Sequence, residues 1–161
     1  MTRMQTARDL LRHTLATLAY RGGKVVREAP EGFAALSLHP STRTPLAILA
    51  HINDLLDWSM RMANGEYRWT TSTPQQWEDE VTRFHATLDQ LDQRLASDEP
   101  LVEKEERIFQ GPIADALTHV GQIALMRRIG GLPVRGENYV KADIAPGRVG
   151  AEQPKPKAEF D

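Results

Sequence analysis

Four stretches of the chain carry apolar residues in alternating steps of three and four, which is the spacing of one face of an α-helix. Breaks rich in proline, glycine, serine and threonine separate them. The stretches cover residues 6–26, 44–63, 73–97 and 111–129. Almost no segment alternates in steps of two, so the sequence predicts an all-α fold, a four-helix bundle that buries the four stripes against one another.

Helix-start signals precede the first three stretches, because a side-chain oxygen that can cap a helix stands there, twice followed by a proline. These signals are Thr6 with Asp9, Thr44-Pro45, and Thr73-Pro74 with Gln76. Gly111-Pro112 predicts the start of the fourth helix. Gly22-Gly23 either ends the first helix or only weakens it. We expect long connections at the first and third links, over residues 28–43 and 98–110, where both periodicities are interrupted or the chain is densely charged.

A chain of 161 residues is long enough for one domain with its own core. We expect the bundle to occupy residues 1–132 and an irregular tail to occupy residues 133–161. The middle of this tail, residues 138–144, contains a tyrosine, a valine and an isoleucine that could pack across the bundle. Its proline- and lysine-containing end is too polar to bury, so we expect its last residues to be disordered.

Charge and composition exclude several classes of function. The formal net charge is −2, which gives no field that would attract nucleic acid or an anionic membrane. No apolar run is long enough for a membrane helix, and the first residues lack the apolar segment of a secretory signal, so we expect a cytoplasmic protein. The chain contains no cysteine. Any transition-metal site must therefore use histidine and carboxylate, and any thiol chemistry would need a low-molecular-weight thiol as cosubstrate.

Asp115 and His119 are four residues apart in the predicted fourth helix, so their side chains lie on one face and can point at one ligand. Two groups are too few for a catalytic metal, which usually takes about three protein ligands. His51, on or beside the apolar stripe of the second helix, is the best third candidate. Two imidazoles and one carboxylate suit Zn²⁺, Ni²⁺ or Fe²⁺ with open positions, and hence Lewis-acid or hydrolytic chemistry.

The same residues also have a purely structural interpretation. An aspartate and a histidine at this spacing can form a local ion pair, and a lone histidine on an apolar stripe is often a satisfied core residue. Gln122 continues the face by one turn and either orients a ligand or only packs. Arg128, near the end of the helix, either complements the helix dipole or receives an acidic substrate.

Three segments together resemble the DinB family. They are LAHINDLLDW at residues 49–58, THVGQ at 118–122 and LMRRIGG at 125–131. The resemblance implies an up-down-down-up bundle, often a homodimer, with a divalent metal held by one histidine of the second helix and a His-x-x-x-His pair of the fourth. His51 and His119 match that pattern, whereas Asp115 stands where the family typically has the other histidine.

Two functions follow as expectations. The resemblance implies a metal-dependent hydrolase or thiol-dependent transferase whose divalent ion is held by His51, Asp115 and His119, acting on a small molecule with no nucleic-acid or membrane partner. The alternative is a non-catalytic dimeric bundle or binding protein in which Asp115 and His119 remain as a polar pair of a degenerate metal site. The aspartate at position 115 is the feature on which the two expectations differ.

Overall fold

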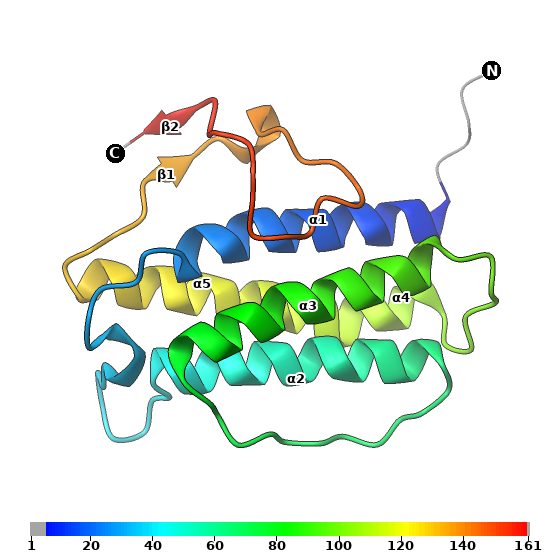
Figure 1. Cartoon of the computed structure of the whole chain (residues 1–161), viewed down its shortest axis with the longest axis horizontal. Helices are drawn as coiled ribbons and strands as arrows, with labels where there is room; N and C mark the ends of the chain where they lie inside the picture. The colour runs from blue at the N-terminus through cyan, green and yellow to red at the C-terminus, as the bar shows by residue number, and fades with distance from the viewer. Residues whose placement is uncertain (1–5, 161) are drawn as a thin grey trace.

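The four apolar stripes form four long helices arranged up-down-down-up, as predicted (Figure 1). The computed structural model describes residues 6–160. Its long helices are α1 (Ala7–Val26), α2 (Pro45–Ala63), α3 (Trp77–Ala96) and α5 (Ala114–Ile129), and α4 (Glu105–Ile108) leads into the last of them. Helices α1 and α2 each pack against both α3 and α5. Each stripe is therefore buried between two neighbouring helices.

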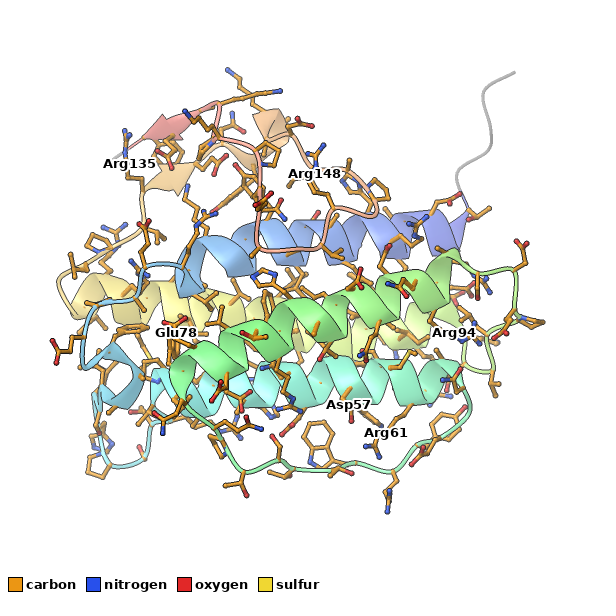
Figure 2. The ribbon with its side chains drawn as sticks, in the orientation of Figure 1. Asp57, Arg61, Glu78, Arg94, Arg135 and Arg148 are labelled. Atoms are coloured by element: carbon orange, nitrogen blue, oxygen red, sulfur yellow. The ribbon has the colours of Figure 1, made fainter. Side chains whose placement is uncertain are left out.

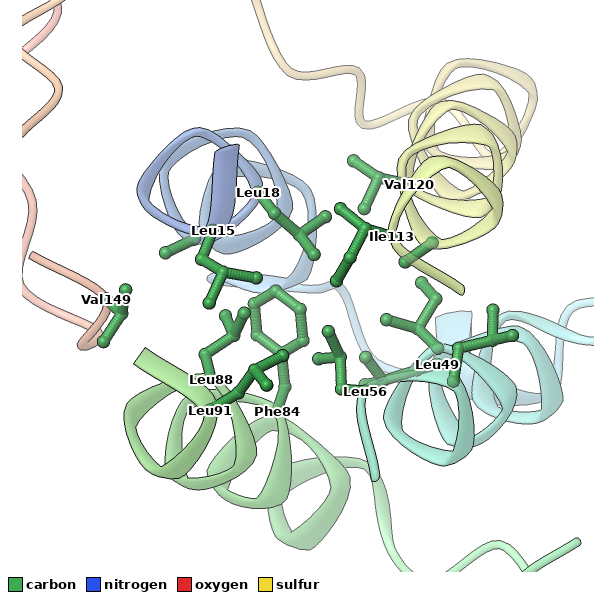
Figure 3. Close-up of a cluster of buried hydrophobic side chains, with 14 of the residues drawn as sticks. Leu15, Leu18, Leu49, Leu56, Phe84, Leu88, Leu91, Ile113, Val120 and Val149 are labelled. Atoms are coloured by element: carbon green, nitrogen blue, oxygen red, sulfur yellow. The ribbon is translucent and has the colours of Figure 1, made fainter. Parts of the chain in front are cut away.

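The core lies along the axis of the bundle, where side chains from all four helices meet (Figure 3). Phe84 of α3 is completely buried at its centre. Its ring lies over Gly22 of α1, where a Cβ atom would be 2.6 Å from Phe84 Cζ. The glycine pair therefore does not end the first helix, which continues to Val26, and Gly22 gives the Phe84 ring the room that it occupies.

Helix α1 begins as its sequence signal predicts. The Thr6 hydroxyl accepts the backbone N–H of Asp9, and the Asp9 carboxylate accepts the backbone N–H of Thr6. Helix α3 instead begins at Trp77, a few residues after Thr73. The buried carboxylate of Glu80 accepts the backbone N–H of Gln75, so residues 73–76 remain extended before the helix.

The predicted start of the fourth helix at Gly111-Pro112 is wrong. The helical path begins at Glu105 and passes through a π-helical segment, Phe109–Ile113, into α5. A proline inside an α-helix lacks an N–H donor and collides with a carbonyl one turn earlier, and Pro112 lies where the α-helical pattern gives way to the wider π turn. Residues 105–108 are helical despite their charge because Ile108 is completely buried in the core.

The prediction of a long first link is confirmed, whereas the prediction of a long third link is wrong. The first link, residues 27–44, is long and contains a 3-10 turn at Phe33–Ala35, but the third link, residues 97–104, is short. The second link, residues 64–76, runs back along the bundle because α2 and α3 are parallel (Figure 1). Arg61 of α2, on the face visible in Figure 2, holds the link through an ion pair with Glu66 (3.3 Å) and a hydrogen bond to Thr70 (3.3 Å).

The tail crosses the side of the bundle formed by α1 and α3 (Figure 1). Strand β1 (Gly136–Glu137) pairs antiparallel with β2 (Glu159–Phe160), and the chain between them buries Val149 beside α1 and α3 (Figure 3). Within the 138–144 segment, Tyr139 packs on α1 as expected, against the Tyr20 ring (6.2 Å between centroids) and the Arg21 guanidinium (4.3 Å), whereas Val140 is exposed. The described end of the tail is paired in β2, and Asp161 lies outside the described residues. Among residues 6–160, no helix has the length and hydropathy needed to span a membrane.

Candidate metal centre

Helices α2 and α5 run in opposite directions side by side, and this packing brings His51 next to Asp115 and His119. His51 Nε2 is 3.7 Å from Asp115 Oδ2, and His119 Nε2 is 3.5 Å from Asp115 Oδ1. One ligand atom from each side chain lies within 4.8 Å of the others. The structure thus brings together the three residues that the sequence nominates as metal ligands, and we call them the triad.

These separations bear on whether the triad can bind a metal or is a simple polar pair. Both carboxylate–imidazole distances are longer than a hydrogen bond, which spans about 2.7–3.2 Å. Two atoms that each lie about 2.1 Å from a tetrahedral metal are about 3.4 Å apart. The triad therefore has ligand-atom separations that can accommodate one shared ion.

His119 is held in the orientation that a ligand needs. Its Nδ1 is 2.7 Å from Oε1 of Gln122, an oxygen that can only accept a hydrogen bond. In the tautomer that donates from Nδ1 to this oxygen, the lone pair of Nε2 faces the triad. An outer hydrogen bond of this kind fixes the tautomer of metal-binding histidines and raises their basicity. The side chain of His119 is only 12% exposed, so its position is well determined by packing.

His51 lies beneath the second link. Its ring makes an edge contact with that of Trp69, at 5.6 Å between centroids, and another with the ring of His119 at 4.7 Å. Trp69 also contacts Trp58 of α2 at 5.6 Å. Burial lowers the pKa of His51, and the positive charge of Arg43 lowers it further. His51 is therefore neutral at pH 7, the form in which an imidazole binds a metal.

Asp115 is the most accessible member, with 47% of its side chain exposed against 21% for His51. It lies in the first turn of α5, directly after the π-helical segment. A pocket of about 460 Å³, with Trp58, Gly111 and Thr118 in its walls, opens onto this carboxylate. Segments of π-helix occur often at functional sites. Here Gln110 and Gly111 of the segment line the pocket beside Asp115.

A second pocket, of about 380 Å³, opens on the other side of the triad, and His119 and Gln122 form part of its wall. Arg43 and Leu38, from the first link, also line it. Small molecules could therefore reach the triad from the His119 side and from the Asp115 side.

Other predicted residues lie elsewhere. Arg128 is exposed in the last turn of α5 and does not line either pocket beside the triad. Its neighbour Arg127 is buried and donates hydrogen bonds to the backbone oxygens of Val25 and Arg27. Arg43 and Trp69 were missed because both lie in irregular links, where periodicity does not fix a side chain's direction. The sequence signal for the contact between Trp69 and His51 is a large aromatic residue within an otherwise polar break.

No family model matches the chain, and no curated protein or solved structure matches it either. What the chain can do is therefore argued from its own geometry. That geometry is a group of two histidines and one aspartate within metal-binding distance, carried by two antiparallel helices of an all-α bundle and flanked by two pockets.

Proposed function

We propose that this chain is a metal-dependent enzyme in which His51, Asp115 and His119 hold one divalent ion, Zn²⁺, Ni²⁺ or Fe²⁺. The observation that carries the proposal is the convergence of the three ligand atoms within 4.8 Å, at carboxylate–imidazole separations that suit a shared ion. Bound there, a divalent cation would supply Lewis-acid chemistry to a water or thiol molecule at its open positions.

The residues of the chain have distinct roles in this proposal. The two imidazoles and the carboxylate bind the ion, and Gln122 keeps His119 in the binding tautomer. Trp69 covers one side of His51, which limits the access of water to that ligand. The two pockets receive the reactants, one beside Asp115 and one beside His119.

The reaction class is that of the DinB-like hydrolases and thiol-dependent transferases, which the second- and fourth-helix motifs resemble. Since the chain has no cysteine, the transferase reaction requires a low-molecular-weight thiol. A small thiol added to cobalt-loaded protein distinguishes the two. A new thiolate-to-cobalt absorption band supports the transferase, whereas an unchanged spectrum supports the hydrolase. The same resemblance supports a homodimer, and the charge and composition support a cytoplasmic location.

Elemental analysis of protein purified without a histidine tag tests the proposal. We expect about one transition-metal ion per chain, and we expect removal of the ion by a chelator to lower the melting temperature. Re-addition of Zn²⁺ should restore it in the wild type and have no effect in the His51→Ala variant.

The alternative, a non-catalytic bundle with a degenerate site, predicts a different pattern. The half-exposed carboxylate of Asp115 is the observation in its favour. In that case His119→Ala lowers the melting temperature by removing the partner of Asp115 on the same helix, and added Zn²⁺ or Ni²⁺ changes the melting temperature of neither protein. Metal-free protein that behaves in this way would overturn the proposed enzyme.

A further inference from the structure

The pocket beside His119 has a composition that selects for one kind of molecule. Aliphatic side chains form much of its wall, and they come from the first link, α2 and α5. They are Leu38, Ile48, Leu125 and Met126. Leu38 and Leu125 are exposed to solvent, so the apolar wall is not covered by the rest of the described chain.

The polar part of the same wall is basic or neutral. Among the described residues, the lining includes no aspartate or glutamate, and the first turn of α2 contains no acidic residue. The hydroxyls of Ser41 and Thr42 are already engaged with His39 in the preceding turn. Arg43 is therefore the one strongly charged group that the pocket presents.

The guanidinium of Arg43 is also available to bind a ligand. Within residues 6–160 it forms no hydrogen bond and no ion pair, whereas arginines elsewhere in the bundle are tightly held. Arg83, for example, is 2.7 Å from Asp54, and Arg12 is 2.9 Å from Asp92. A guanidinium binds carboxylates through parallel N–H donors, so a free one at the rim of an apolar pocket is suited to an organic anion.

We infer that this pocket takes an organic carboxylate with an apolar body, and that Arg43 is the residue that binds its charge. The inference rests on the proposed function, because His119 belongs both to the pocket and to the triad. Arg43 binds the carboxylate, the aliphatic wall holds the body, and the reacting group of the same molecule faces the metal centre. The substrate class is thus a small apolar acid.

Hexanoate and its neutral counterpart hexanamide are suitable probes, because they differ in charge and little in shape. We would titrate each into the isotope-labelled full chain, metal-free and zinc-loaded, and follow the amide signals of the pocket by NMR. We expect hexanoate to bind about five- to tenfold more tightly than hexanamide, which is the range of one ordinary net hydrogen bond. Arg43→Gln should remove this preference and leave hexanamide binding unchanged, and Arg43→Lys should retain part of it.

Lys155→Gln is the matched control, because it removes one positive charge from an exposed residue of the tail, which packs on the α1 and α3 side of the bundle. Equal hexanoate affinities for Arg43→Gln and the wild type would overturn the inference, as would a lack of pocket shifts with hexanoate, even if zinc binds normally. An Arg43-dependent preference in a protein that binds no zinc would overturn the metal-dependent enzyme and leave the anion pocket standing. The two failures are therefore distinguishable.

Discussion

Gly22 and Gly23 are adjacent in α1 but face different surroundings. A Cβ atom at Gly22 would be 2.6 Å from the buried ring of Phe84, and one at Gly23 would be 3.6 Å from the ring of His85. We expect Gly22→Ala to lower the free energy of unfolding by about 1–3 kcal/mol, because the core cannot accommodate an added methyl group. Gly23→Ala should be neutral or should raise it by up to about 1 kcal/mol, through helix propensity.

Urea denaturation of the two variants measures this difference directly, since they differ only in which side of the helix receives the methyl group. A Gly22→Ala protein at least as stable as the wild type would show that the Phe84 ring moves without penalty. The close contact at the centre of the bundle would then not explain the glycine.

Gln122 is the residue that fixes the tautomer of His119. We expect Gln122→Leu to weaken zinc binding by about 10- to 100-fold, the usual effect of losing an outer hydrogen bond to a metal ligand. Gln122→Glu keeps an acceptor oxygen and should retain most of the affinity. A competition titration against a chromophoric chelator gives both values. Equal affinities for the two variants would contradict the proposed role.

At the scale of elements, the tail is attached to the bundle through a buried cluster of charged and polar groups. Glu137 of β1 accepts hydrogen bonds from Tyr20 (2.6 Å) and Lys24 (2.9 Å) of α1. Lys24 also binds Glu159 of β2 at 2.8 Å. Burial alone would lower the pKa of Lys24, but its two carboxylate partners outweigh that effect and raise it. Both strands of the tail are therefore held by one lysine.

Breaking this cluster tests whether the tail is part of the folded unit. Glu137→Gln removes one partner of a buried ion pair, and we expect it to lower the free energy of unfolding by about 2–4 kcal/mol. Glu152→Gln, an exposed position of the same tail, should change it by less than about 0.5 kcal/mol. Similar urea midpoints for the two variants would indicate that the tail contributes little to the stability of the bundle.

His85 connects α3 to the tail, and its titration makes the stability of the folded protein depend on pH. Its Nδ1 donates to the backbone oxygen of Val149 at 3.2 Å. Burial lowers its pKa, an effect to which the charge of Arg27 adds and which the hydrogen bond partly opposes. Folded protein therefore binds fewer protons than unfolded protein below about pH 6.5, the ordinary pKa of histidine. Stability should be full above that pH and decline as the pH falls toward the lowered pKa.

Urea unfolding at pH 7 and pH 5 measures this effect in the wild type and in His85→Gln. The variant should lose less stability over the interval, because one titrating group has been removed. His51, whose pKa is lowered in the same direction, remains in both proteins and its contribution cancels in the comparison. Equal losses in the two proteins would show that His85 is as accessible to protons in the folded state as in the unfolded chain.

At the scale of the whole molecule, the sequence correctly predicts those features that depend only on residues close together in the chain. The stripes of α1, α2 and α3 and the cap at Thr6 depend on neighbouring residues, and their predictions are confirmed. The start of the last helix was missed because Pro112 ordinarily begins a helix, and only burial of Ile108 keeps the chain helical before it. The lengths of the links depend on which helices are parallel, and tertiary packing decides that.

In the candidate site, too, some contacts follow from local spacing and others depend on tertiary packing. The spacing of Asp115 and His119 predicts that they share a helix face, because both belong to one helix. Their approach to His51 requires α2 and α5 to be antiparallel neighbours, which the resemblance implied and the spacing alone did not. Trp69 and Arg43 reach the site from irregular links, whose paths are set by contacts far along the chain.

The central claim is that His51, Asp115 and His119 hold one divalent ion together. A zinc competition titration of tag-free, metal-stripped protein tests it most directly, with His13→Ala as a control that removes a histidine of α1 outside the triad. We predict one tight site per chain in the wild type and in His13→Ala, and a loss of affinity of about tenfold or more in each alanine variant of the triad. A wild-type chain that binds no zinc, or triad variants that bind it as tightly as His13→Ala, would contradict the claim.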